Sequence, residues 1–286
     1  MSFRTRFAPS PTGPLHLGHA YSAMLAHDMA MAEGGAFLLR IEDIDNTRSR
    51  PEWEDGIFED LRWLGLSWEE PVMRQSERLP AYRDALQTLW HQNSLLYPCT
   101  CTRKDISAAL SAPQEGDTAF GPDGPVYPGT CREVSSRLGK MPKGVALRLD
   151  MSSALSTTGE SNFSFQEAGL NGPREVSFSA REVFQGIGDI VLSRKDFLGS
   201  YHLSVVIDDA AQEITHVVRG EDLFEATKIH VILQRILGLP TPIYHHHRLI
   251  RDEDGKRLAK RDDARAIRKY REDGATPADI RRMVGL

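Results

Sequence analysis

Short apolar runs alternate with longer helical patterns through the first hundred residues of this 286-residue chain. Phe3–Phe7 and Ala36–Ile41 have the length and apolar character of strands, whereas His16–Glu33 and Pro51–Leu64 have the periodicity of helices. Strands that alternate with helices predict βαβ units, in which the strands pair in parallel. The sequence is therefore typical of an α/β fold built on a doubly wound parallel sheet.

The pattern changes after the first hundred residues. A further helix is expected from Ser76 to about Leu96, and the sequence then becomes rich in Pro, Gly, Ser and Thr. This composition predicts an insertion, in which 111–128 is expected to form a mobile loop. Regular structure is expected to return near 176–178, near 190–192 and along 203–218, followed by a helix over 224–237. The expected domains are 1–97, the first half of the sheet domain; 98–172, the insertion; 173–247, the second half; and 248–286, a C-terminal loop and helical stem.

The composition is that of a globular chain without a membrane span. Apolar residues make up 40% and charged residues 26%, and no apolar run approaches the ~20 residues that a membrane helix needs. The N-terminus lacks the regions of a secretory signal, so the expected location is the cytosol, with no membrane partner. Formal net charge is −5, yet residues 248–286 hold 12 Lys/Arg against 8 Asp/Glu. A polyanion is therefore expected to contact the C-terminal end.

The loop between the first expected strand and helix, Pro9–His19, holds three prolines and two glycines around a His-Leu-Gly-His tetrapeptide. A helix that begins at the carboxyl edge of a parallel sheet presents unpaired N–H groups that attract phosphate. Gly13 and Gly18 let the backbone approach a ligand closely, and His16 and His19 share a face of the first turn. Two histidines on a Pro-rich surface turn would show the same spacing, so the pair alone does not establish a triphosphate site.

Five ordered segments resemble those of class I glutamyl-tRNA synthetases. Arg6–His19 resembles the first signature of that family, whose HIGH-type tetrapeptide binds ATP. The further matching segments are 40–45 (Arg-Ile-Glu-Asp-Ile-Asp), 201–203 (Tyr-His-Leu), 214–222 (Ile-Thr-His-Val-Val-Arg-Gly-Glu-Asp) and 254–261 (Asp-Gly-Lys-Arg-Leu-Ala-Lys-Arg), the last similar to a KMSKS-type loop. The resemblance covers nearly the whole chain and implies a Rossmann-type catalytic domain with a zinc-bearing insertion and a short helical C-terminal stem.

The resemblance implies a pocket for glutamate. Arg6 and Arg219 would bind its carboxylates, because a planar guanidinium matches a carboxylate with two parallel hydrogen bonds. Glu42 would receive the α-ammonium group of the substrate. The residues that would complete the pocket are Ala8, Ser10 and Tyr201. Taken without the family, Arg6 and Glu42 could instead form a salt bridge between neighbouring strands.

The resemblance also implies an ATP site. Lys260 and Arg257 of the KMSKS-type loop would stabilise the charge that builds on departing pyrophosphate, with Mg²⁺ accompanying ATP. The loop departs from the family pattern, since Arg257 stands where the first Lys is usual and Ala259 replaces a Ser. Without the family, these residues would be read as a solvated basic turn. The residues implied to bind ATP are Pro9, His16, Gly18, His19 and Lys260.

Three cysteines lie within the insertion. Cys99, Cys101 and Cys131 are too few for a disulfide framework, and in a reducing compartment such a cluster more often holds a metal. Spacing alone leaves zinc and unbound thiols open, because zinc takes four ligands and no histidine lies in this stretch. The resemblance implies a Cys-x-Cys…Tyr-x-x-x-Cys zinc site, with Tyr127 as the fourth ligand. His245-His246-His247 is not expected to hold metal, because side chains alternate along a strand.

The expected acceptor follows from the length of the chain. It ends 25 residues after Arg261, whereas glutamyl-tRNA synthetases continue into an anticodon-binding region. Short members of the family, the glutamyl-queuosine tRNA(Asp) synthetases, have this outline, which implies activation of glutamate without tRNA and its transfer to queuosine in tRNA(Asp). Expected partners are ATP, glutamate and the anticodon arm of tRNA(Asp), with salt-sensitive phosphate contacts, for a monomer. A truncated enzyme that charges a tRNA 3′ end and a non-catalytic glutamate- or nucleotide-binding paralogue remain alternatives.

Overall fold

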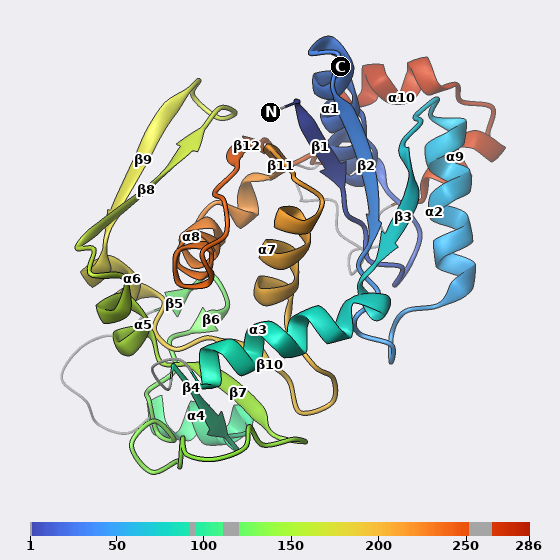
Figure 1. Cartoon of the computed structure of the whole chain (residues 1–286). Helices are drawn as coiled ribbons and strands as arrows, with labels where there is room; N and C mark the ends of the chain where they lie inside the picture. Colours follow the sequence, from blue (N-terminus) through green and yellow to red (C-terminus); the bar gives the residue numbers. More distant parts are fainter. Residues whose placement is uncertain (1, 92–94, 111–119, 252–264) are drawn as a thin grey trace.

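The computed structural model describes residues 2–91, 95–110, 120–251 and 265–286 (Figure 1). β1 (Arg4–Phe7) pairs in parallel with β2 (Ala36–Ile41), and β2 pairs in parallel with β3 (Glu69–Arg74). On the other side of β1 lies β11 (His216–Gly220), where the Thr215 N–H donates to the Arg4 carbonyl oxygen. β11 pairs in parallel with β12 (Ile243–His247). The strand order reverses between β1 and β11, which confirms the predicted doubly wound topology and opens a crevice at their carboxyl ends.

Helices cover both faces of this sheet (Figure 1). α1 (Leu17–Ala32) and α2 (Pro51–Trp63) share one apolar core with the sheet, and α3 (Leu79–His91), α7 (Tyr201–Ala211) and α8 (Ala226–Leu237) share another. The strands β1 and β2 divide their side chains between these cores by simple alternation. The α1 side takes Phe37, Leu39 and Ile41, while Leu38 faces the other core. Arg6 pairs in register with Leu38 and therefore points to the α7 side.

Residues of the predicted insertion and of the segments that flank it form a second lobe around an antiparallel sheet. Its strands are β4 (Leu96–Cys99), β7 (Ala146–Leu149) and β10 (Val191–Ser193), with β7 in the centre. The helix predicted to reach Leu96 was wrong at its end, because α3 ends at His91 and Leu96 begins β4. Leu95 and Leu96 form part of an apolar core that β4 and β7 share with α3. Strand β3 was also not predicted.

Smaller elements complete the lobe and link it to the main sheet. α4 (Arg103–Leu110) and the hairpin of β5 (Phe120–Gly121) and β6 (Gly124–Pro125) lie near β4 and β7 (Figure 1). The hairpin falls within the loop predicted over 111–128, of which 111–119 lies outside the described residues. The remaining elements are α5 (Met151–Thr158), β8 (Asn162–Glu167), β9 (Arg174–Ser179), α6 (Ala180–Gly186) and two short 3₁₀ turns, η1 (Gln75–Arg78) and η2 (Glu221–Leu223).

The C-terminal residues return to the first helix. α9 (Ile267–Glu272) and α10 (Pro277–Val284) follow one another, and α10 packs against α1 through a two-point ion pair between Arg281 and Asp28, with N–O distances of 2.6 and 3.0 Å. The Ile267 N–H donates to the Leu15 carbonyl oxygen. None of the described helices combines the length and apolar character that crossing a bilayer requires.

Candidate active site

Two buried arginines of the sheet share one carboxylate of α7. Arg6 donates from Nε to Asp209 Oδ1 at 2.9 Å and from Nη2 to Oδ2 at 3.3 Å, while Arg40 donates from Nη1 to Oδ1 at 2.6 Å. Burial opposes ionisation of Asp209, but the two guanidinium groups outweigh it and lower the pKa of Asp209 to about 2. The cluster therefore fixes Arg6 at the carboxyl end of β1 in a charged environment.

Arg219, near the end of β11, is held by two histidines. Its Nε donates to His246 Nε2 at 3.2 Å and its Nη1 lies 3.0 Å from His230 Nδ1. Burial and the adjacent Arg219 lower the pKa of His230 well below its usual value and that of His246 to about 4. Both rings are therefore neutral at pH 7 and accept hydrogen bonds from the guanidinium, which also stacks over the Tyr244 ring at 5.0 Å.

Glu42 and Tyr201 face the same part of the crevice from two elements. Glu42 lies just after β2, where its carboxylate accepts from Arg40 Nη2 at 3.2 Å, and its N–H donates to the Pro9 carbonyl oxygen. Burial raises the pKa of Glu42, although Arg40 and Arg6 oppose the shift. Tyr201, the first residue of α7, is partly exposed to the cavity and interacts electrostatically with Arg219, Glu42 and Arg6, and desolvation by the surrounding protein raises its pKa. These side chains thus surround one volume.

The first turn of α1 is capped by its own histidines. The Gly18 N–H donates to His16 Nδ1 at 3.1 Å, the His16 N–H donates to His19 Nδ1 at 3.2 Å, and the rings stack with centroids 3.7 Å apart. Because each Nδ1 accepts a hydrogen bond, each neutral ring carries its proton on Nε2. A Cβ on Gly18 would lie 3.1 Å from His16 Cε1, so a larger residue here would displace the ring by a few tenths of an ångström. Ala266 forms a β-bridge with His16.

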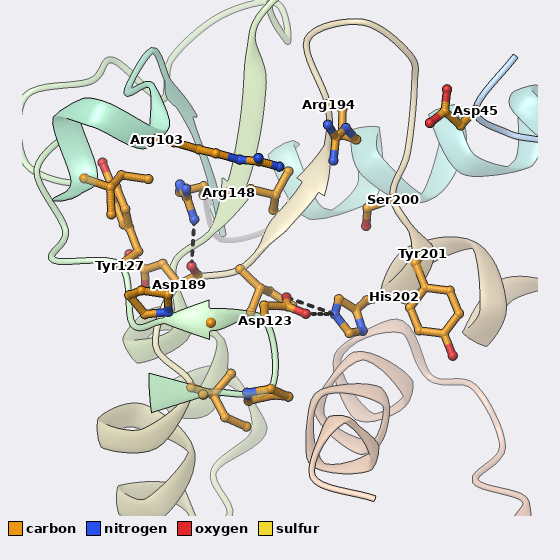
Figure 2. A pocket seen from close by; sticks show the side chains of 18 of the residues that line it. Asp45, Arg103, Asp123, Tyr127, Arg148, Asp189, Arg194, Ser200, Tyr201 and His202 are labelled. Carbon is orange, nitrogen blue, oxygen red and sulfur yellow. Dashed lines mark hydrogen bonds and ion pairs between the residues drawn. The ribbon is translucent and has the colours of Figure 1, made fainter. Parts of the chain in front are cut away.

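A cavity of about 1060 Å³ connects this crevice with the insertion. Ser10, Glu42 and Tyr201 line one part, and residues of α4, the β5–β6 hairpin and β7 line another. Figure 2 shows Asp123 of the hairpin pointing at His202 of α7, whose Nε2 lies 3.0 Å from both carboxylate oxygens. The cavity is larger than an amino acid requires, and it has charged walls of both signs. Its charged lining includes Asp45, Arg48, Arg103, Asp123, Arg148, Asp189 and Arg194.

The predicted cysteine cluster assembles beside this cavity. Cys101 Sγ lies 3.5 Å from Cys131 Sγ, and the ligand atoms of all three thiols lie within 4.8 Å of one another. Tyr127 Oη lies 3.4 Å from Cys99 Sγ and 3.3 Å from Cys101 Sγ. Burial opposes ionisation of Cys131, yet hydrogen bonds from Tyr127 and the Thr100 N–H lower its pKa to about 6. Three soft sulfur donors and one oxygen in a compact group suit a tetrahedral metal ion.

The family follows from a match along nearly the whole chain. A family model described as the catalytic domain of class I tRNA synthetases (E and Q) matches residues 2–286. The chain belongs to this family. It is 61% identical over 283 residues to the Glutamyl-Q tRNA(Asp) synthetase of Rhodobacter capsulatus, covering 99% of each chain. It is 40% identical over 290 residues to the protein of that name from Nitratidesulfovibrio vulgaris, covering 97% of this chain and 83% of the relative.

Solved structures agree with this assignment. The glutamate-tRNA synthetase of Elizabethkingia anophelis superposes on the whole chain with a TM-score of 0.74 and 27% identity. The match extends over 61% of that longer chain, so the two proteins share the catalytic fold but not their full length. Membership in the synthetase family makes this protein a ligase.

The synthetase fold brings most of the predicted site residues to one crevice. Ser10, Glu42 and Tyr201 line the cavity. Arg6 and Arg219 lie close enough to Tyr201 to favour its ionised form electrostatically. Among the described residues Arg6 pairs with Asp209 of α7, and Glu42 pairs with Arg40 of its own strand. The salt bridge between neighbouring strands that was considered from sequence, Arg6 with Glu42, is therefore not formed. The roles of Ala8 and Pro9, at the end of β1, stay predictions. Arg257, Ala259 and Lys260 lie outside the described residues.

Sequence reasoning missed the groups that position the synthetase arginines. These groups are Asp209 and His202 of α7, Arg40 of β2 and His230 of α8. Arg40 and His202 lie within the matched segments 40–45 and 201–203, and the signal for Asp209 was a pair of acidic residues in the apolar run of α7. His246 belongs to the histidine cluster for which the sequence predicted no metal, and its Nδ1 lies 2.5 Å from Glu167 Oε2. Within the described ranges, the cysteines are the one group whose side chains gather as metal ligands do.

Proposed function

We propose that this protein activates glutamate with ATP in the absence of tRNA and transfers it to queuosine in the anticodon loop of tRNA(Asp). The observation that carries the proposal is the cavity, which joins the predicted glutamate residues Ser10, Glu42 and Tyr201 to a space lined by the insertion. At about 1060 Å³ it can hold an aminoacyl group together with a nucleoside. The names of the Rhodobacter and Nitratidesulfovibrio relatives support this acceptor.

In the proposed first step, a glutamate carboxylate oxygen bonds to the α-phosphorus of ATP, and the bond from that phosphorus to pyrophosphate breaks. The attacking carboxylate is already ionised, so no general base is required, and catalysis consists of positioning and electrostatic stabilisation. Arg6 and Arg219 bind the substrate carboxylates, and Glu42 receives the α-ammonium group. Each guanidinium keeps at least one N–H that its described contacts do not use.

The phosphates are assigned to the start of α1. His16 and His19 carry their protons on Nε2 and donate from there, beside the N–H groups of the helix. Lys260 and Arg257 are assigned to the departing pyrophosphate, since Ala266, only six residues after Lys260, pairs with His16. Mg²⁺ enters with ATP and neutralises phosphate charge. In the second step an acceptor oxygen attacks the activated carbonyl carbon and AMP leaves.

The insertion is proposed to hold one structural zinc ion. The donors would be Cys99, Cys101, Cys131 and Tyr127, which fill the four positions of a tetrahedral site. Zinc bound there would fix the strand β4 and the segment before Cys131 with respect to each other. The protein is proposed to act in the cytosol as a monomer.

Glutamate-dependent exchange of pyrophosphate into ATP tests the first step. We expect exchange without tRNA, followed by transfer of labelled glutamate to queuosine-containing tRNA(Asp) and not to the unmodified transcript. Absence of exchange would show a non-catalytic paralogue. Exchange only with tRNA(Glu) present would favour a truncated enzyme that charges a 3′ end, and transfer to unmodified tRNA(Asp) would rule out queuosine as the acceptor.

A further inference from the structure

A second hollow, which we call the basic groove, adjoins the cavity. Its volume is about 560 Å³, and Arg194 and Phe197 line both spaces. The walls are α3, the segment 140–145 and the segment 193–198 that follows β10. Basic side chains gather on all three walls. They are Arg83, His91, Lys140, Lys143, Arg194 and Lys195.

The positive charges of the basic groove have no acidic partner among the residues that the structure describes. Within the described part of the chain, none of its five lysines and arginines forms an ion pair. Arginines nearby behave differently, since Arg78 pairs with Asp208, Arg132 with Asp189 and Arg137 with Asp150. The groove contains a single acidic side chain, Asp196, although the chain as a whole has a net charge of −5. Such a concentration of unpaired cations favours an anionic ligand.

The walls of the basic groove are fixed by hydrogen bonds. Trp90 Nε1 donates to the Gly139 carbonyl oxygen at 2.8 Å, which attaches the segment carrying Lys140 and Lys143 to α3. The Arg194 N–H donates to the Gly199 carbonyl oxygen, which closes the other segment. The Arg194 guanidinium lies 5.3 Å from the centre of the Phe197 ring. An aromatic ring beside unpaired cations suits a nucleic-acid strand, whose bases stack while its phosphates meet lysine and arginine.

We propose that the basic groove binds the phosphodiester backbone of the RNA next to the nucleotide that enters the cavity. This inference rests on the proposed function, because it assigns a path to the same RNA acceptor. Continuity through Arg194 and Phe197 lets one strand occupy both spaces. A concave groove also fits a strand better than it fits a flat lipid surface.

The test compares Lys140→Gln/Lys143→Gln/Lys195→Gln with a matched triple variant on α6 and α8, Arg181→Gln/Lys228→Gln/Arg235→Gln. Binding of an unmodified tRNA(Asp) transcript is measured between 50 and 200 mM salt by fluorescence anisotropy, together with tRNA-independent pyrophosphate exchange. For the groove variant we expect Kd to rise roughly tenfold or more. The slope of the logarithm of the binding constant against the logarithm of salt concentration, called the salt slope, should decrease in magnitude by about 2 to 3, as for three lost phosphate contacts. Exchange should equal that of the unaltered protein.

Three outcomes would overturn the groove proposal. The first is a groove variant whose Kd for the transcript and salt slope are unchanged. The second is a loss of transcript binding in the α6 and α8 variant that equals the loss in the groove variant. The third is a groove variant that loses binding to phosphatidylserine vesicles but still binds the transcript. If the unaltered protein binds the transcript with the expected groove dependence but shows no exchange, the proposed glutamate activation fails and the RNA site stands.

A separate observation concerns the hydrogen bonds behind Arg219. Arg219 donates to His230 Nδ1, so the proton of that neutral ring lies on Nε2, which is 3.1 Å from His202 Nδ1. The proton of His202 therefore lies on its Nε2, which donates to Asp123. A second, similar path runs from Arg219 through His246 to Glu167. Each path ends on a carboxylate, one buried in the sheet and the other on the hairpin of the insertion.

We infer that Asp123 is a positioning residue for glutamate activation. Its negative charge polarises His202 and His230 in sequence, and the strengthened acceptor on His230 holds the Arg219 guanidinium in the orientation that binds glutamate. The inference rests on the proposed role of Arg219. It also links the hairpin, which lines the acceptor cavity, to the amino-acid pocket.

Steady-state pyrophosphate exchange without tRNA isolates this effect from any contact between Asp123 and the acceptor. For Asp123→Asn and for His202→Phe we expect the KM for glutamate to rise roughly two- to thirtyfold, with the KM for ATP and the melting temperature little changed. The double variant should show no further rise, because both changes break one path. Asp123→Glu should restore part of the affinity, and Glu133→Gln, an exposed carboxylate of the same lobe, should have no effect.

A glutamate KM unchanged in Asp123→Asn, or additive effects in the double variant, would overturn the inference while leaving glutamate activation intact. If the unaltered protein lacks glutamate-dependent exchange, the proposed function fails and the role of Asp123 fails with it.

Discussion

The guanidinium of Arg6 and the carboxylate of Asp209 form a two-point ion pair that joins the first strand to α7 across 203 residues of sequence. Because Arg40 donates to the same carboxylate, Asp209→Asn leaves two buried guanidinium groups with one charge fewer to balance them. We expect a loss of about 3 to 5 kcal/mol in the free energy of unfolding, measured by urea denaturation at pH 7.

The pH dependence of this loss has a definite sign. The folded pKa of Asp209, about 2, lies below the ordinary value of 3.8, so its contribution is complete above pH ~4 and disappears as pH falls toward 2. The difference between the unaltered protein and Asp209→Asn should therefore shrink in that interval. A difference that stays constant down to pH 2 would contradict the pairing.

Glu42 is predicted to reduce the stability of the free protein while serving the substrate. Burial raises its pKa above 4.5, so its ionised form is disfavoured in the fold. Glu42→Gln should raise the KM for glutamate by about 10- to 150-fold, the effect of losing one hydrogen bond to a charged group, without lowering the melting temperature. In the unaltered protein the same KM should increase as pH falls through an inflection above 4.5. Glu52→Gln, on the exposed start of α2, is the control.

The local sequence pattern was sufficient to predict most helices and strands, but not the ion pairs that form between them. Phe3–Phe7 and Ala36–Ile41 alternate with helical periods, and such periods are properties of neighbouring residues. Strand β3 contains Glu69, Glu70 and Pro71 and lies at the edge of its sheet, so it carries little of the apolar pattern of a strand. The Arg6–Asp209 pair could not be predicted, because only the assembled sheet brings β1 and α7 together.

The same distinction applies to the site. The family resemblance singled out Glu42, Tyr201 and Arg219, since each belongs to a short segment of recognisable sequence, and the structure brings them to one crevice. The histidines that hold Arg219 have no such segment. His230 lies on the buried face of an ordinary apolar helix, and its role depends on a contact with His202, which is 28 residues away.

Gly18→Ala is predicted to impair ATP use without weakening the fold. The new Cβ would lie 3.1 Å from the His16 ring, which must move by a few tenths of an ångström. Since about 1 Å of misplacement can cost roughly a hundredfold, we expect a kcat/KM for ATP lower by roughly three- to tenfold in pyrophosphate exchange. Gly56→Ala in α2 meets no atom within 4 Å. That control should instead gain about 0.5 to 1 kcal/mol of stability with unchanged kinetics.

Removal of zinc is predicted to destabilise the insertion. Cys131→Ser should lower the zinc content measured by atomic emission from about one equivalent to near zero, because three-ligand thiolate sites lose affinity with each sulfur. A chelator should lower the melting temperature of the unaltered protein, by the equivalent of about 4 kcal/mol if zinc was a thousandfold above its Kd, and leave Cys131→Ser unaffected. Thr130→Ala, at the exposed neighbouring position, should retain zinc. A zinc-free unaltered protein would contradict the site.

The ionised carboxylate of Asp60 is predicted to lower the free energy of unfolding at neutral pH. Its side chain is buried in α2, and burial raises its pKa to about 6, despite the nearby Arg271. Above pH 6 the folded protein must carry a buried charge that the unfolded chain ionises freely, so Asp60→Asn should raise the unfolding free energy at pH 8 by about 1 to 3 kcal/mol. The gain should diminish between pH 6 and 4 and vanish below, where both states are protonated. Asp55→Asn, exposed on the same helix, should change stability by less than ~0.5 kcal/mol throughout. Destabilisation by Asp60→Asn at pH 8 would show instead that the Asp60 charge stabilises the fold through the neighbouring arginines.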